Sequence, residues 1–221
     1  MTIEFYNEDC MAVMARYPDN HFELAIVDPP YSDETKSLDR LLQDMSGRKA
    51  RAGVIRTDTL QGAPNEEYWQ ELLRVSKNQI IWGVNWYTRV FGVGRIVWDK
   101  DNAGSNFSDC ELAYQSINRK TDLFKFTWNG MIQGDMKNKE KRIHPTQKPV
   151  KLYEWLLANY AKEGDKILDT HGGSMSSMIA CHYGGFDAVC CELDKDYFEA
   201  GKLRFEKETS QLAMFWISKG I

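Results

Sequence analysis

A tetrapeptide near the amino terminus, Asp28-Pro29-Pro30-Tyr31, directly follows the apolar run Ala25-Ile26-Val27. Two successive prolines have no backbone N–H and disfavour helix, so the chain stays extended and its carbonyls can accept hydrogen bonds. A carboxylate beside a carbonyl suits an exocyclic amino group, which has two N–H bonds to donate. The Tyr31 ring can stack on the base that carries this group. The plainer interpretation is a rigid strand exit with an aromatic lid.

A second candidate site is the segment 167–174, Ile-Leu-Asp-Thr-His-Gly-Gly-Ser, which runs from a predicted strand through a turn into a predicted helix. Its glycines, Gly172 and Gly173, let a ligand approach the backbone closely, and the following helix N-terminus favours an anion. Glu192 ends the next predicted strand, where a carboxylate can accept hydrogen bonds from both ribose hydroxyls. The pattern indicates a nucleoside cofactor, although many such turns are only structural.

With these residues the chain resembles the amino-methylating DNA methyltransferases, whose signature is Asp-Pro-Pro-Tyr. Three further segments carry the resemblance: Asp169–Met175 is similar to Asp-Pro-Phe-x-Gly-Ser-Gly, His144–Pro149 matches His-Pro-Thr-Gln-Lys-Pro, and Asn7–Cys10 is similar to the family's Gly-Asp-Cys turn. The chain departs from the family at Thr170 and His171, which replace Pro-Phe, and at Met175, which replaces a glycine. Along the chain the tetrapeptide comes before the glycine turn that resembles the cofactor-binding segment. This is the circularly permuted motif order of the β class of these methyltransferases.

The resemblance implies S-adenosylmethionine as cofactor and assigns roles to particular residues. The catalytic set is Asp28, Pro29, Pro30 and Tyr31. Lys148 and the Thr146 hydroxyl are expected to receive the cofactor's carboxylate, and Asp9 its adenosine, although Asp9 could simply form a turn. The full cofactor-binding set is Asp9, Cys10, Asp28, Thr146, Lys148, Asp169, Thr170, His171, Gly172, Gly173, Ser174 and Glu192.

The reaction implied is methyl transfer to an exocyclic nitrogen of a base flipped out of double-stranded DNA. Adenine N6 is the expected target, because Asp in the first position of the tetrapeptide is commoner among adenine enzymes. Cytosine N4 and RNA remain open alternatives, as does a non-catalytic accessory protein that binds S-adenosylmethionine or DNA. A protein-glutamine methyltransferase and a nicotinamide dehydrogenase fit the residues less well.

Short apolar segments alternate with helical patterns along the chain and predict a doubly wound α/β sheet. The six candidate strands are 3–6, 24–27, 79–82, 95–98, 166–168 and 187–191. Helices are predicted after Asn65 as N-cap, from Pro149, from Ser176 to Tyr183 and from Lys195 to about Thr209. The resemblance implies a mostly parallel, seven-stranded, Rossmann-like methyltransferase sheet in one domain, 1–221.

The net charge of −4 and the pI near 5.6 argue against a generally cationic, nucleic-acid-coating surface. Two segments without clear periodicity are nevertheless basic: 36–56 has a net charge of +4 and 119–151 of +6. We therefore predict irregular insertions at 32–64 and 118–143 that contact DNA. The candidate DNA-binding residues are Lys36, Arg40, Arg48, Lys49, Arg51, Lys137, Lys139, Lys141 and Arg142.

The remaining expectations concern compartment and partners. The amino terminus has no basic region followed by an apolar one, and no apolar run is long enough to span a membrane, so a cytoplasmic protein of a bacterial or phage-infected cell is expected. Five cysteines without Cys-x-x-Cys or Cys/His ligand spacing predict neither disulfides nor a metal site. A homodimer is possible, because β-class relatives often dimerise.

Overall fold

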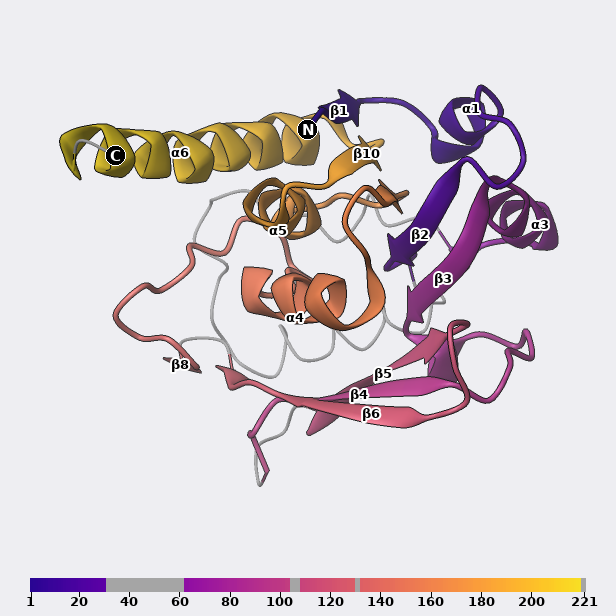
Figure 1. Ribbon diagram of the computed structural model, residues 1–221. Coiled ribbons are helices and arrows are strands. Elements are labelled where there is room, and N and C mark those ends of the chain that lie inside the picture. Colours follow the sequence, from indigo (N-terminus) through magenta and orange to yellow (C-terminus); the bar gives the residue numbers. More distant parts are fainter. Residues whose placement is uncertain (31–61, 104–107, 130–131, 220–221) are drawn as a thin grey trace.

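An eight-stranded, mostly parallel sheet forms the centre of the protein (Figure 1). The computed structural model describes residues 1–30, 62–103, 108–129 and 132–219, with side chains as far as residue 210. The strand order is β1-β10-β9-β2-β3-β5-β4-β6, in which β5 is antiparallel to both its neighbours. The strands are β1 (Ile3–Tyr6), β2 (Phe22–Val27), β3 (Ser76–Trp82), β4 (Arg95–Asp99), β5 (Cys110–Gln115), β6 (Thr121–Lys125), β9 (Lys166–Asp169) and β10 (Asp187–Cys191).

Helices cover both faces of this sheet, as the doubly wound prediction requires (Figure 1). One face carries α1 (Cys10–Met14) and α3 (Glu66–Val75), and the other carries α4 (Val150–Tyr160), α5 (Ser176–Gly184) and α6 (Lys195–Lys219). A short 3₁₀ helix, η1 (Val84–Trp86), follows β3, and a two-stranded ribbon of β7 (Trp128–Asn129) and β8 (Ile132–Gln133) stands apart from the sheet.

The apolar strand β2 contributes side chains to two hydrophobic cores, one on each face of the sheet. Successive side chains of a strand point to opposite faces, so a strand covered on both sides is apolar throughout. Leu24 and Ile26 pack in the cluster that includes α4 and α5, whereas Ala25 and Val27 pack in the cluster that includes α1 and α3. All four are at most 1 % exposed. The residues that follow β2 are therefore presented from a rigid, fully buried strand.

All six predicted strands are present, and four of them begin or end one to three residues beyond the predicted bounds. Asn65 caps α3 as predicted, because its side chain accepts a hydrogen bond from the backbone N–H of Tyr68 over 2.9 Å. Pro149 is the N-cap of α4 instead of its first helical residue, and α6 continues ten residues past the expected end.

Two predictions about the sheet are wrong in detail. The sheet has eight strands, not seven, and the segment 118–143 is not irregular, since it contains β6, β7 and β8. β6 pairs in parallel with β4, with Thr121, Leu123 and Lys125 exposed. A polar edge strand of this kind has no continuous apolar run, so its period is hard to see in sequence. The other predicted insertion, 32–64, lies outside the described residues except for 62–64.

Candidate active site at the carboxyl edge of the sheet

The residues predicted to do chemistry meet where β9 and β2 lie side by side. From β9 the chain continues into α5 and on to β10, while from β2 it continues towards α3 and β3 on the opposite side. Such a point, where neighbouring strands send the chain in opposite directions, opens a crevice at the carboxyl ends of the strands, and ligands of α/β sheets bind there. Asp28 follows β2 and Asp169 ends β9, so both lie at this crevice.

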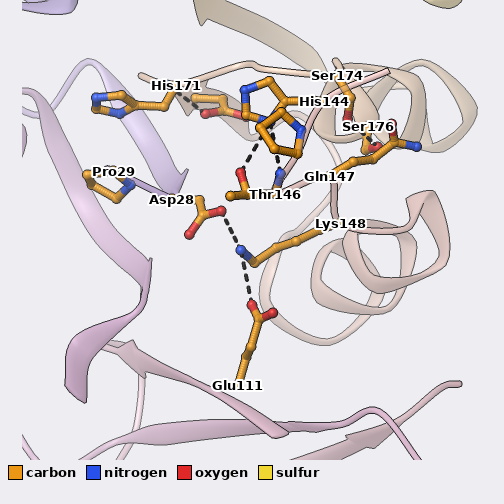
Figure 2. A network of polar contacts seen from close by, with 12 residues as sticks. Asp28, Pro29, Glu111, His144, Thr146, Gln147, Lys148, His171, Ser174 and Ser176 are labelled. Atoms are coloured by element: carbon orange, nitrogen blue, oxygen red, sulfur yellow. Dashed lines mark hydrogen bonds and ion pairs between the residues drawn. The ribbon is translucent and has the colours of Figure 1, made fainter. Parts of the chain in front are cut away.

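Asp28 is held by a buried lysine from the other half of the chain (Figure 2). The Nζ atom of Lys148, just before α4, forms an ion pair with Oδ2 of Asp28 and lies 3.1 Å from Oε2 of Glu111 in β5. Lys148 is only 4 % exposed, and its ammonium lies 5.5 Å from the centre of the Trp82 ring. Lys100 completes the chain of charges by pairing with the other carboxylate oxygen of Glu111.

The charges of this network support one another. Burial acts to lower the pKa of Lys148, but Asp28 and Glu111 outweigh it and hold that pKa above its usual value. Burial acts to raise the pKa of Glu111, but Lys148 and Lys100 outweigh it and hold that pKa below its usual value. Acidic and basic side chains therefore alternate along this network in the order Asp28, Lys148, Glu111 and Lys100.

The Pro29 carbonyl has a neighbour that the sequence did not suggest. The hydroxyl of Tyr87, which follows η1, donates a hydrogen bond of 2.8 Å to this oxygen. A carbonyl oxygen has two lone pairs, so this bond orients the Pro29 peptide and leaves the capacity for a second donor. Tyr31, the last residue of the tetrapeptide, lies outside the described residues.

The turn after β9 is built around Asp169, which is 2 % exposed. Its Oδ1 accepts from the backbone N–H of His171 over 3.0 Å, and its Oδ2 accepts from the Ser177 hydroxyl. Burial raises the pKa of Asp169 to about 6, against the effect of these donors. The buried Asp169 carboxylate therefore stabilises the turn by accepting hydrogen bonds from both of its ends.

A hydrogen-bonded chain fixes the two residues that replace Pro-Phe. The Thr170 hydroxyl lies 2.7 Å from the Tyr68 hydroxyl and 2.8 Å from Nδ1 of His171. Burial lowers the pKa of His171 to about 4, so its imidazole is neutral near pH 7. His171, which stands where the family's motif has phenylalanine, is therefore an uncharged aromatic ring that also forms polar contacts.

Met175 keeps the backbone conformation expected of the glycine it replaces. Its φ of 59° and ψ of 24° lie in the left-handed region, which costs a residue with a side chain about 1–2 kcal/mol. The Met175 side chain is completely buried, and burial of a methionine contributes about 1.5–3 kcal/mol, which offsets that cost. At Gly172, an added Cβ would lie 2.3 Å from Sγ of Cys190, so this position requires glycine. The close-approach turn is thus preserved despite the altered sequence.

The predicted ribose and adenosine partners both bind backbone N–H groups. Glu192 accepts from Gly173 over 2.8 Å and from Asp194 over 2.9 Å, which joins the carboxyl end of β10 to the glycine turn. Burial raises the pKa of Glu192. Asp9 caps α1 by accepting from the backbone N–H of Met11, as in the simple-turn alternative. Burial raises the pKa of the neighbouring Cys10 to about 12, so its thiol is not ionised near pH 7.

The matched His-Pro-Thr-Gln-Lys-Pro segment lies against the glycine turn. The His144 ring lies 4.4 Å from the ring of Tyr197 in α6, and its Nδ1 is 3.1 Å from the Thr146 hydroxyl. It also lies beside Gly173, where an added Cβ would come within 3.4 Å of it. The segment therefore supplies Thr146 and Lys148 to one side of the crevice and packs on the turn with His144 (Figure 2).

The basic segment 137–142 is anchored at both ends. The Asp135 carboxylate accepts from the backbone N–H groups of Lys137 and Asn138, and the Gln133 side chain forms two hydrogen bonds with the backbone of Glu140. Lys137, Lys139, Lys141 and Arg142 are all exposed. The Arg142 guanidinium also donates to the Pro145 carbonyl over 2.7 Å. These four predicted DNA-binding residues form one surface segment, whereas Lys36, Arg40, Arg48, Lys49 and Arg51 lie outside the described residues.

A buried ion pair links this basic segment to the glycine turn. Arg204 in α6, 8 % exposed, donates to the Ser174 carbonyl over 2.7 Å and to the Ser176 hydroxyl over 2.9 Å. The same guanidinium pairs with Oε2 of Glu140 over 2.6 Å. Arg204, Tyr87, Glu111 and Lys100 are site residues to which the sequence interpretation gave no role.

Within the residues the structure describes, no group of three or more His, Cys, Asp and Glu side chains could hold a metal ion. No helix in the same residues is long and apolar enough to cross a membrane.

Comparison with known proteins finds similarity to DNA methylases in sequence and in fold. The DNA methylase (N6/N4 methyltransferase) family model matches residues 100–203. The Type II methyltransferase M2.MboI of Moraxella bovis is 22 % identical over 244 aligned residues, which cover 94 % of this chain and 89 % of that protein. On these findings the chain is similar to N6/N4 DNA methylases.

Solved structures are similar to this chain in fold. The M1.HpyAVI complex with S-adenosylmethionine has a TM-score of 0.55 at 18 % identity, and the match covers 92 % of this chain and all of that one. The PvuII DNA methyltransferase, described as cytosine-N4-specific, has a TM-score of 0.57 at 13 % identity and covers 95 % of this chain and 91 % of that one. One protein with this fold is therefore described as acting on cytosine.

Proposed function

We propose that this protein transfers a methyl group from S-adenosylmethionine to the exocyclic N6 of adenine in double-stranded DNA. The observation that carries the proposal is the position of Asp28 and Pro29: a carboxylate in contact with Lys148 and an oriented carbonyl at the crevice between β9 and β2. The glycine turn that opens α5 lies on the other side of this crevice.

The described residues fit the cofactor. Gly172 leaves no room for a side chain, Met175 keeps the left-handed conformation, and Glu192 lies at the end of the adjacent strand. The residues expected to hold the cofactor are those of the glycine turn together with Asp9, Cys10, Thr146 and Glu192. Lys148, which the sequence also predicted as a cofactor ligand, is ion-paired with Asp28. S-adenosylmethionine supplies an electrophilic methyl group on its sulfonium sulfur.

The chain's own contribution is to activate and place a weak nucleophile. The lone pair of an exocyclic amino nitrogen is delocalised into the base, and acceptance of its two N–H bonds by Asp28 and the Pro29 carbonyl localises that lone pair on nitrogen. The nitrogen gains the methyl group and gives up one proton. We assign the Asp28 carboxylate as the acceptor of that proton. Alignment of the two reacting groups contributes up to about 7–11 kcal/mol in favourable intramolecular cases.

The target base leaves the duplex at a cost of a few kcal/mol, and stacking on Tyr31 would offset part of that cost. The exposed lysines of segment 137–142 would contact the phosphates. Methylation of cytosine N4 is the second candidate, since the same acceptor pair serves that amino group and a structure of this fold is described as cytosine-N4-specific. A single domain, a homodimer and a cytoplasmic location remain predictions.

The direct test is incubation of the purified protein with unmethylated DNA and S-adenosylmethionine, followed by nucleoside mass analysis. N6-methyladenine is the expected product, and N4-methylcytosine would move the assignment to the second candidate. Methylation of RNA but not DNA, with matched RNA as the parallel substrate, would contradict the proposal. Cofactor binding in calorimetry without any methylated product would indicate the accessory protein instead.

A further inference from the structure

Lys148 stands between two carboxylates that come from distant parts of the sheet. Asp28 follows β2, and Glu111 lies in β5, which enters the sheet in the opposite direction, so both reach the same edge. The side chain of Lys148 is 3 % exposed, and those of Asp28 and Glu111 are 13 % and 26 % exposed. An ammonium this deeply buried is stable only when paired, and here it has two partners and the Trp82 ring.

We propose that Lys148 and Glu111 are positioning residues, which hold the Asp28 carboxylate as an oriented hydrogen-bond acceptor for the target amino group. The inference deepens the proposed function and rests on it. It gives the Lys148 ammonium a partner inside the protein instead of the cofactor's carboxylate, which was its predicted ligand.

The geometry favours this role. Lys148 contacts Oδ2 of Asp28, which fixes the rotation of the carboxylate about its own axis. Glu111 pulls the ammonium from the opposite side, and Lys100 pairs with Glu111 in turn, so each member is restrained by the next. Groups held in place before the reaction stabilise a transition state without reorganising during it.

The charges around Asp28 come from several elements. Lys148 is the cation in contact with it, and Glu111 and Lys100 lie behind Lys148. Asp169 at the end of β9 is a second acid that interacts with Asp28. Tyr87 and Tyr153 interact with it as well, from the segment after η1 and from α4, and both have raised pKa values because they are buried. Lys148 is a cation that offsets these neighbouring acids.

The first experiment measures the rate of single-turnover methyl transfer and the affinity for S-adenosylhomocysteine in the wild type and three variants. Lys148→Met should slow transfer about tenfold or more, because the Asp28 carboxylate loses the ammonium that orients it. Glu111→Gln should slow transfer less, because Lys148 keeps its contact with Asp28. Lys148→Arg keeps the charge and should restore most of the rate.

A loss of transfer without a loss of cofactor affinity, rescued by Lys148→Arg, is not expected from a purely structural role. Affinity for S-adenosylhomocysteine, measured by calorimetry, should stay within about threefold in Lys148→Met. A large loss of that affinity with little change in the rate of transfer would return Lys148 to the cofactor's carboxylate and overturn the inference.

A second measurement needs no turnover, so it separates this inference from the proposed function. The ¹⁵Nζ resonance of Lys148, assigned by its loss in Lys148→Met, should shift in Asp28→Asn and in Glu111→Gln. It should not respond to Glu154→Gln, which removes the partner of the exposed Lys151. A shift together with a wild type that methylates nothing would contradict the proposed function and leave the pairing intact. An unchanged resonance in Asp28→Asn would contradict the pairing itself.

Discussion

The hydroxyl of Tyr87 donates a hydrogen bond of 2.8 Å to the carbonyl oxygen of Pro29. Tyr87 follows β3 and Pro29 follows β2, the neighbouring parallel strand, so the bond joins two strand exits at the same edge of the sheet. The Tyr87 ring packs against Trp69 of α3, with 5.2 Å between ring centres. Proline cannot donate a backbone hydrogen bond, so the Pro29 peptide is oriented through its carbonyl.

Tyr87→Phe tests whether this orientation contributes to transfer. The ring packing is kept and one hydrogen bond is lost, which is worth about 0.5–1.5 kcal/mol. We expect single-turnover methyl transfer to fall about three- to tenfold, with the affinity for S-adenosylhomocysteine unchanged. Tyr183→Phe is a control, because Tyr183 lies in α5 and its hydroxyl contacts the Glu208 carbonyl of α6. Equal rates in wild type and Tyr87→Phe would mean that Pro29 needs no such support.

Asp28→Ala tests the central assignment. Removal of one preorganised polar group from an active site costs about 10²- to 10³-fold in rate, and we expect at least that loss of methyl transfer. Binding of S-adenosylhomocysteine should persist, because the glycine turn is built by Asp169 and Glu192 without Asp28. Turnover close to that of the wild type in a tritiated-methyl assay would rule out Asp28 as the acceptor.

The buried ion pair of Arg204 and Glu140 predicts a large effect on stability. Arg204→Met leaves Glu140 buried without its cation, and loss of one partner of such a pair costs about 3–5 kcal/mol. We expect urea unfolding to show a loss of this size. Replacement of both residues, in Arg204→Met with Glu140→Leu, should recover part of it.

The matched control is Arg16→Met, which breaks the pair of Arg16 with Glu8 on the surface. Solvent screens that pair, so its loss should be small by comparison. If Arg204→Met proved as mild as Arg16→Met, the guanidinium would not be holding the glycine turn and the basic segment together.

The buried His144 imidazole should make the free energy of unfolding depend on pH. Burial lowers its pKa to about 4, from an ordinary value near 6.5, so between these values the unfolded chain binds a proton that the folded chain does not. Stability therefore falls as pH falls from 6.5 towards 4, by about 1.4 kcal/mol per pH unit for this residue. Asp169 acts in the opposite direction, because its pKa is raised to about 6 and the folded chain binds its proton first.

The contribution of His144 is measured as a difference from His144→Gln, which does not titrate. The free energy of unfolding of the wild type, minus that of the variant, should rise with pH between about 4.5 and 6 and then level off above 6.5. A difference that stays constant over this range would show that the imidazole titrates normally in the folded state.

Local sequence predicted most of the sheet and the edge at which the site lies. The runs before Asp28 and Asp169 are short, apolar and followed by a turn, and such patterns depend on neighbouring residues alone. β6 was missed because its side chains alternate on an exposed edge, where composition resembles that of a loop. Met175 was recognised as a departure from the family, but only its dihedral angles show that this position takes the left-handed conformation that favours glycine.

The partners of the site residues could not be read from the sequence. Lys148 and Asp28 are 120 positions apart, and Arg204 and Glu140 are 64 apart. Their pairing depends on strand order and on helix packing. Burial also depends on the complete fold: it makes the His171 imidazole neutral and places Glu111 between two lysines. The sequence indicated which side chains could take part in the chemistry. The tertiary structure determines which of these side chains are in contact.

The exposed lysines of segment 137–142 predict a salt-dependent contribution to DNA binding. Each lysine on a phosphate releases counterions, and the slope of log affinity against log salt changes by about 0.9 per contact. Substitution of Lys137, Lys139 and Lys141 by Gln should therefore weaken binding to DNA of any sequence and reduce the slope by about 2–3.

The control substitutes Lys162, Lys166 and Lys202, which are also exposed. Lys162 and Lys166 lie at the amino end of β9, away from the crevice, so this equal change of net charge should leave the slope nearly unaltered. Equal effects of the two triple variants would mean that only overall charge matters and that segment 137–142 does not contact the phosphates.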